Sequence, residues 1–229
     1  MFTIYKAQIN SNWIPLQYQN LLSQLPPIIA TKIAQYKNPK DQQSRILAKL
    51  MLQRLLLDFQ LPFTLSQLTY THSNKPQFPY SGFDFSTAHS GDLILCGGLL
   101  DTMRHFEFPA TSHQLPATQP KLGIDLELMD NHLDLSLYQD YLTPTEWAFI
   151  HHSPNILRAF YSIWTRKEAF AKAIGRGIDL VFRHHDLSDY AIDYQNNTYY
   201  IYDLNIDSEY IGAVVCTNQL EINIIDFKI

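Results

Sequence analysis

Residues 122–128 have the sequence LGIDLEL, in which every second residue is leucine or isoleucine. This alternation predicts a β-strand with Asp125 and Glu127 on one face and with Ile124, Leu126 and Leu128 facing the core. Two carboxylates this close repel each other unless a cation lies between them, and Mg²⁺ commonly binds one or two carboxylates together with substrate phosphates. An Asp-x-Glu pair alone is more often the solvated face of an edge strand, so a metal site here needs support from elsewhere in the chain.

A second motif, WTRKEAFAK at residues 164–172, lies in a predicted helix that begins near residue 153 and ends at Gly175. Glu168 and Lys172 are one helical turn apart on it. Glu168 would complete a three-carboxylate metal site with the strand pair, and Lys172 would meet a phosphate held by that metal. The alternative is an ordinary ion pair on an exposed helix face.

A third motif, AHSG at residues 88–91, follows a predicted strand at residues 83–88. An imidazolium, a hydroxyl and free backbone N–H groups at a strand end can bind an anion, although a lone histidine there is more often structural. Further cations precede it: Arg45 and Lys49 on a predicted helix over residues 44–59, and Lys75 in an Asn-Lys-Pro turn.

Composition and charge narrow the class of protein. The 229 residues carry 17 Lys and Arg against 22 Asp and Glu, a net charge of −5, which argues against a protein that binds a nucleic-acid backbone. No apolar run approaches the ~18 residues of a transmembrane helix, and the first residues lack the pattern of a signal peptide. We therefore expect no nucleic-acid or membrane partner and a cytoplasmic location. Cys96 and Cys216 lie in apolar runs and are predicted to be buried thiols.

The order of predicted elements indicates an α+β fold in two parts. A strand, a helix and further strands are predicted for residues 1–104. The proline-containing stretch over residues 105–121 is predicted to be a linker loop, and the hydrophobic periodicity is already lost from residue 101. Residues 122–229 begin with the LGIDLEL strand, continue through a Thr143–Glu146 capping box and the long helix, and end in predicted antiparallel strands. Both parts place a helix beside strands, which is a weak sign of duplication.

Taken in order, these motifs resemble the 4′-phosphopantetheinyl transferase superfamily, in its larger, surfactin-synthetase-activating (Sfp-like) type. The resemblance covers about residues 44–216 and is carried chiefly by Gly-x-Asp-x-Glu at residues 123–127 and Trp-x-x-Lys-Glu-Ala-x-x-Lys at residues 164–172. It implies a monomer built as a pseudo-dimer of two similar α+β half-domains, with the active site in the cleft between them and the metal site in the C-terminal half.

The resemblance also implies an activity. Such an enzyme, of the holo-[acyl-carrier-protein] synthase kind, moves the 4′-phosphopantetheine arm of coenzyme A to a serine of an apo acyl or peptidyl carrier protein and releases adenosine 3′,5′-bisphosphate. Mg²⁺, or Mn²⁺ in its place, would be held by Asp125, Glu127 and Glu168. Glu168, Lys172 and Asp125 would be catalytic, with Glu168 the candidate base. The residues implied in binding coenzyme A are Arg45, Lys49, Lys75, His89 and Lys172.

Three positions depart from the family pattern. Asn74 stands where the family usually has Gly before Lys-Pro, Ala88 stands where it often has Ser, and the stretch from residue 101 to residue 121 is longer than the usual link. Two other functions stay open: a non-catalytic homologue that binds coenzyme A or a carrier protein, and, less favoured by the acidic net charge, a metal-dependent phosphodiesterase. The His151-His152 and His184-His185 pairs are predicted to be surface residues.

Overall fold

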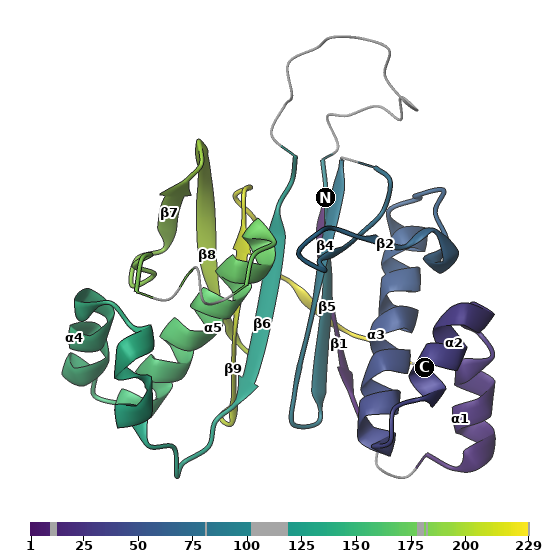
Figure 1. Cartoon of the computed structure of the whole chain (residues 1–229), viewed down its shortest axis with the longest axis horizontal. Coiled ribbons are helices and arrows are strands. Elements are labelled where there is room, and N and C mark those ends of the chain that lie inside the picture. Colours follow the sequence, from purple (N-terminus) through teal and green to yellow (C-terminus); the bar gives the residue numbers. More distant parts are fainter. Residues whose placement is uncertain (10–12, 81, 102–118, 178–180, 182, 229) are drawn as a thin grey trace, which may run out of the picture.

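The structure is a computed structural model that describes residues 1–9, 13–80, 82–101, 119–177, 181 and 183–228. It confirms the α+β class: two four-stranded sheets stand side by side, and helices cover the outer face of each (Figure 1). Most of the predicted linker, residues 105–118, lies outside the described residues. Among the described residues, no helix has the length and apolar character needed to cross a membrane.

The first sheet has the strand order β10-β1-β5-β4 and packs against the long helix α3. The first half of the chain contains β1 (Phe2–Gln8), α1 (Pro15–Leu22), α2 (Pro27–Ala34), α3 (Pro39–Asp58), the short 3₁₀ helix η1 (Leu65–Gln67), β2 (Thr69–Tyr70), β3 (Pro76–Gln77), β4 (Phe83–Ser90) and β5 (Leu93–Leu100). Strands β2 and β3 pair with each other in a separate two-stranded sheet. Helix α3 begins five residues earlier than predicted, because the Asn38 side chain accepts from the Lys40 N–H and Pro39 occupies the first helical position.

The second sheet has the order β6-β9-β8-β7 and packs against α5. Its elements are β6 (Leu122–Leu128), the 3₁₀ helix η2 (Leu135–Tyr141), α4 (Pro144–His152), α5 (Ile156–Ile174), β7 (Ala191–Tyr194), β8 (Asn197–Asn205) and β9 (Tyr210–Cys216). The predicted Thr143–Glu146 capping box is present at the start of α4. Gly175 ends α5 as predicted, in the left-handed conformation at φ +66°.

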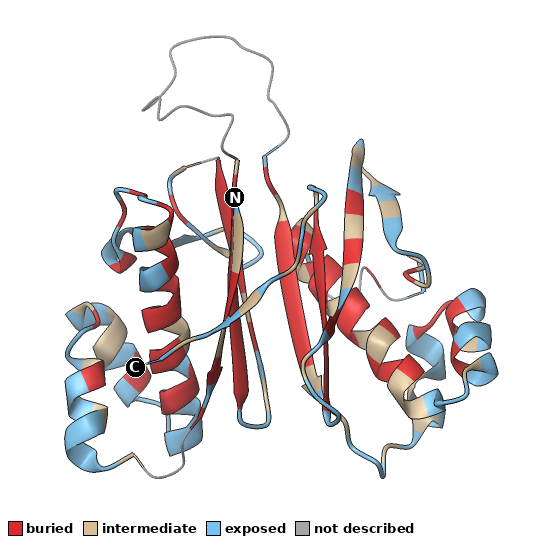
Figure 2. Cartoon of the chain, turned by 180° about the vertical axis from the view of Figure 1, so that it is seen from behind, coloured by how far each residue is buried: buried red, intermediate tan, exposed pale blue. Residues whose placement is uncertain are grey.

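The last strand, β10 (Ile224–Asp226), belongs to the first sheet. It pairs in parallel with β1, so the C-terminal segment crosses from the second sheet to the edge of the first (Figure 2). The antiparallel pairing predicted for the C-terminal strands holds for β7, β8 and β9 but not for β10, whose partner is more than 200 residues away in sequence.

Apolar side chains fill three layers. The first lies between α3 and its sheet, the second between the two sheets, and the third between α5 and its sheet. Ile124 and Leu126 of β6 enter the middle layer beside Ile4 and Leu95, as the alternation predicts, whereas Leu128 is 39% exposed. Cys96 and Cys216 are buried free thiols, as expected.

A buried ion pair anchors α4 to α5. Lys167 Nζ lies 2.8 Å from Glu146 Oε2, and both side chains are fully buried. The same ammonium donates to the His185 carbonyl at 2.9 Å, and the second Glu146 oxygen accepts from the Leu187 N–H at 2.9 Å. The two charges are therefore compensated inside the protein, which a buried pair requires.

We expect Lys167→Ala to lower the free energy of unfolding by roughly 3–5 kcal/mol, since it leaves the Glu146 carboxylate buried without its cation. Chemical denaturation measures this change. The matched control is Lys40→Ala, which removes the exposed Lys40–Asp92 pair at 2.6 Å and should cost less than about 1 kcal/mol. Equal losses in the two variants would contradict the account.

Candidate active site

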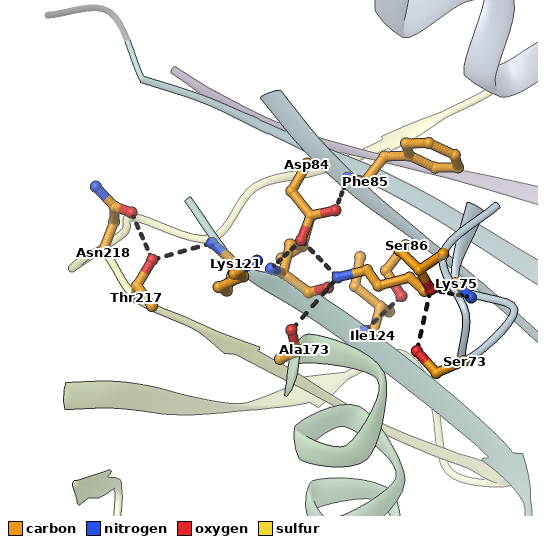
Figure 3. A network of polar contacts seen from close by, with 12 residues as sticks. Ser73, Lys75, Asp84, Phe85, Ser86, Lys121, Ile124, Ala173, Thr217 and Asn218 are labelled. Carbon is orange, nitrogen blue, oxygen red and sulfur yellow. Dashed lines mark hydrogen bonds and ion pairs between the residues drawn. The ribbon is translucent and has the colours of Figure 1, made fainter. Parts of the chain in front are cut away.

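Strands β4 and β6 meet along a seam made by side chains. The N–H groups of one edge of β6 donate to side-chain oxygens of β4, each pair separated by the same 38 residues, so the two strands run parallel in a fixed register. The bonds are Leu122 to Asp84 Oδ2 at 2.8 Å, Ile124 to Ser86 Oγ at 2.9 Å and Leu128 to Ser90 Oγ at 2.9 Å (Figure 3 shows the first part of this seam).

Ala88 occupies the one position of this seam that lacks a polar side chain. The register places it beside Leu126, whose backbone N–H opposes the rise in the pKa of Asp125. The departure from the family's serine at residue 88 therefore leaves this seam position without a side-chain acceptor.

Gly123 lets α5 lie directly against β6. A Cβ at this position would come within 1.8 Å of the Ala169 carbonyl oxygen and 2.6 Å of the Ala173 backbone nitrogen. Both are backbone atoms of α5 and cannot give way as a flexible side chain would. Because Gly123, Asp125 and Glu127 share one face of the strand, the same contact brings Glu168 and Lys172 over the two carboxylates.

Asp125 and Lys172 form the closest pair in the site. Lys172 Nζ lies 2.7 Å from Asp125 Oδ1 and 3.0 Å from the Ile124 carbonyl oxygen. The Asp125 side chain is 8% exposed and that of Lys172 34%, so the ammonium lies where the buried carboxylate reaches solvent. Burial raises the pKa of Asp125, and the Lys172 charge opposes that shift. The second oxygen, Asp125 Oδ2, is buried without a hydrogen-bond partner among the described residues.

Glu127 is held by the first half of the chain. Ser90 Oγ donates to Glu127 Oε2 at 2.9 Å while accepting from the Leu128 N–H. Burial and then the negative charge of Asp125 raise the pKa of Glu127, and the Ser90 hydrogen bond lowers it. Ser90 thus ties the AHSG motif of β4 to a carboxylate of the Gly-x-Asp-x-Glu motif.

The pKa of the Glu168 carboxyl lies near neutral pH. Its burial, followed by the negative charges of Asp125 and Glu127, raises its pKa to about 7, although Lys172 acts in the opposite direction. A carboxyl that titrates near neutral pH is suited to accept and release a proton. The two strand carboxylates predicted from the sequence therefore act on the helix carboxylate across β6 and α5.

The cations predicted to bind phosphate, Arg45, Lys49, Lys75 and His89, differ in burial and in their neighbours. The pKa of the exposed His89 is lowered by desolvation and then by the charges of Arg45 and Lys172, so His89 lies within electrostatic reach of both the α3 cation and the carboxylate group. The Arg45 guanidinium stacks 3.9 Å from the centre of the Tyr36 ring. Lys49 is half-buried, and desolvation lowers its pKa.

Lys75 is not gathered with these cations. Its ammonium lies 2.6 Å from Asp84 Oδ2, and Asp84 is five residues before His89 on β4, about 16 Å along the strand. The sequence motifs did not predict Asp84 as the partner of Lys75. The signal was present, since Asp84, Ser86 and Ser90 follow the period-two pattern of one strand face.

The donor set suits a hard divalent cation in its chemistry. Asp125 raises the pKa values of Glu127 and Glu168, and Glu127 raises that of Glu168. A buried oxygen of Asp125 also lacks a partner among the described residues, so added positive charge would be stabilised there. Within the described part of the chain, no three His, Cys, Asp or Glu side chains already lie at metal-binding distances. Lys172 holds one oxygen of Asp125 in this arrangement.

The second half of the chain matches a known family. Residues 121–217, from the start of β6 to just after β9, match the family described as the 4′-phosphopantetheinyl transferase superfamily. This range includes the three carboxylates and Lys172. The resemblance inferred from the sequence motifs is confirmed.

Curated relatives carry the same name. A Haemophilus influenzae protein provisionally named a 4′-phosphopantetheinyl transferase is 33% identical over 137 residues, which are 59% of this chain and 52% of the relative. The human L-aminoadipate-semialdehyde dehydrogenase-phosphopantetheinyl transferase is 24% identical over 203 residues, 79% of this chain and 59% of the relative. The chain thus spans between about half and three fifths of the length of these relatives.

We expect Gly123→Ala to destabilise the protein by at least ~3 kcal/mol, because the added methyl group would collide with the α5 backbone. Thermal or chemical unfolding gives the value. Gly177→Ala is the matched control, since no atom of the described residues lies within 4 Å of a Cβ at that exposed position. Similar stabilities of the two variants would show that α5 does not contact β6 at Gly123.

Glu168 should make stability depend on pH. Its folded pKa is raised from 4.5 to about 7, so the folded state holds the proton more tightly than the unfolded state, and stability falls as pH rises through this range. Without divalent cations, Glu168→Gln should therefore gain roughly 1–3 kcal/mol over the wild type between pH 4 and pH 8. Exposed Glu221→Gln is the control. A flat difference between wild type and Glu168→Gln would contradict the shifted pKa.

Proposed function

Because this chain carries a domain of the 4′-phosphopantetheinyl transferase superfamily over residues 121–217, we propose that it transfers the phosphopantetheine arm of coenzyme A to a serine of an apo acyl or peptidyl carrier protein. The observation that carries the proposal is the group at the β4–β6 seam, in which Lys172 pairs with Asp125 beside a glutamate that titrates near neutral pH. That group combines a base with a cation at a developing negative charge, which phosphoryl-type transfer requires.

In the proposed reaction the carrier serine oxygen forms a bond to the phosphorus that bears the pantetheine arm. The P–O bond to adenosine 3′,5′-bisphosphate breaks, and the leaving phosphate takes the electron pair. Glu168 is the proposed acceptor of the serine proton, directly or through water, since its pKa is raised to about 7 in the metal-free protein. Lys172 moves from Asp125 to the pyrophosphate and balances the charge that develops on the leaving group.

Mg²⁺ is the metal we propose for this site, held by Asp125, Glu127 and Glu168. It would polarise the pyrophosphate oxygens and neutralise their charge. Hard carboxylate oxygens and the unpartnered buried Asp125 Oδ2 support this choice. Ser90 then serves to orient Glu127 through its 2.9 Å hydrogen bond.

The nucleotide end of coenzyme A is proposed to lie toward α3. Arg45 and Lys49 are the cations on that side, and the effect of both Arg45 and Lys172 on the pKa of His89 supports a role for His89 in the same site. Desolvation and then the neighbouring cations lower the pKa of His89, and a negatively charged 3′-phosphate would favour its charged form.

The arrangement of the halves supports a pseudo-dimer within one monomeric chain. Each half packs one long helix, α3 or α5, against a four-stranded sheet, and the proposed site lies where β4 of one half meets β6 of the other. We place the half-domains at residues 1–104 and 122–229, with residues 105–121 as the link. Strand β10 belongs to the second half in sequence and pairs with β1 of the first half.

Intact mass spectrometry of apo carrier proteins tests the proposal. Wild-type enzyme with coenzyme A and Mg²⁺ should add one phosphopantetheine mass to at least one acyl or peptidyl carrier. EDTA or Asp125→Asn should lower the rate by at least ~100-fold, since each removes charge compensation from the transition state. Coenzyme A binding without transfer on any carrier would favour the non-catalytic homologue, and the absence of both would refute the proposed function.

A further inference from the structure

The ammonium of Lys75 is enclosed by protein oxygens from three elements. It donates to Asp84 Oδ2 at 2.6 Å, to the Leu122 carbonyl at 3.1 Å and to the Ala173 carbonyl at 3.4 Å (Figure 3). The Lys75 side chain is 15% exposed and that of Asp84 is 11% exposed. A lysine has three N–H donors, so these three acceptors use all of them and leave none for a phosphate.

The partners of Lys75 adjoin the catalytic pair. Ala173 follows Lys172 in the last turn of α5, where helix carbonyls lack intrahelical donors and favour a positive charge. Leu122 precedes Gly123, the residue at which α5 contacts β6. Lys75 therefore joins the end of α5 to the start of β6, on both sides of the Gly123 contact.

Asp84, in the first half of the chain, is the acidic partner of Lys75, and we call the set of contacts made by Lys75 and Asp84 with β6 and α5 the clasp. The oxygen that pairs with Lys75 also accepts the Leu122 N–H at 2.8 Å, and the other oxygen accepts the Phe85 N–H at 3.0 Å. One carboxylate of β4 thus binds the backbone of β6 directly and the backbone of α5 through Lys75.

The turn between β2 and β3 presents Lys75 in a defined position. The Lys75 N–H donates to Thr71 Oγ1 at 3.0 Å, the Thr71 N–H donates to the Lys75 carbonyl at 2.9 Å, and Asn74 adopts φ +61°. Asn tolerates this left-handed conformation, so it replaces the family's glycine before Lys-Pro. The turn delivers a cation of the first half to a helix end of the second half.

We propose that Lys75 and Asp84 are positioning residues, which set the distance between Lys172 and Asp125 by fixing α5 on β6, rather than residues that bind coenzyme A. This inference rests on the proposed function and revises the part that the sequence resemblance implied for Lys75. Desolvation lowers the pKa of Lys75 and the Asp84 charge opposes the shift, as for an ion pair that belongs to the protein interior.

The test compares Lys75→Met, Asp84→Asn and the double variant with wild type. Lys75→Met alone leaves the Asp84 carboxylate buried without a cation and can prevent folding. The double variant removes both charges, and the asparagine keeps an acceptor for the Leu122 N–H. Lys6→Met is the control, because Lys6 pairs with Asp226 at 3.2 Å on the β1–β10 edge, remote from β6 in the sheet order.

Three readouts separate positioning from ligand binding. In the double variant we expect amide hydrogen exchange over the last turn of α5 and the start of β6 to accelerate at least ~10-fold, with α4 unchanged. Coenzyme A should bind within about 3-fold of the wild-type Kd by calorimetry, whereas kcat for carrier modification should fall roughly 10–100-fold. Asp84→Asn should show the same pattern, and Lys6→Met should match wild type in all three.

A loss of coenzyme A affinity of about 10-fold or more with unchanged exchange and kcat would overturn the inference and return Lys75 to the coenzyme A site. Unchanged values in every readout would also overturn it. If wild type neither binds coenzyme A nor modifies any carrier, the proposed function fails. The exchange comparison then decides alone whether the clasp fixes α5 on β6.

Discussion

The backbone contact between α5 and β6 at Gly123 is the constraint on which the site depends. Only a residue without a side chain permits it, since a Cβ would come within 1.8 Å of a carbonyl oxygen. The contact brings Lys172 within 2.7 Å of Asp125 and places Glu168 close enough to both strand carboxylates to shift its pKa. Without this contact, Glu168 and Lys172 of α5 would not lie beside Asp125 and Glu127 of β6.

The seam between β4 and β6 gives the site a second source of order. Side-chain oxygens of Asp84, Ser86 and Ser90 hold the free edge of β6, and Ser90 also orients Glu127. The first half of the chain therefore fixes the strand that carries the acidic residues, besides holding the cations that we propose for coenzyme A. A site shared in this way loses its geometry when either half moves.

Local signals in the sequence predicted much of this structure. The bounds of β6, the capping box of α4 and the end of α5 follow from alternation, capping chemistry and a glycine, all of which act within a few residues. The pairing of β10 with β1 and the contact of Lys75 with Ala173 join residues far apart in the chain, so no local pattern reveals them. The resemblance implied a role for Lys75 from its motif alone, whereas its partners depend on the folded arrangement.

A crystal structure with coenzyme A and Mg²⁺ bound tests the central claim most directly. We expect the pyrophosphate and the metal ion at Asp125, Glu127 and Glu168, with the Lys172 ammonium transferred from Asp125 to a phosphate oxygen. Lys75 should keep its contacts with Asp84 and the Ala173 carbonyl. Coenzyme A bound away from the β4–β6 seam, or bound there with no metal ion on these carboxylates, would contradict the account.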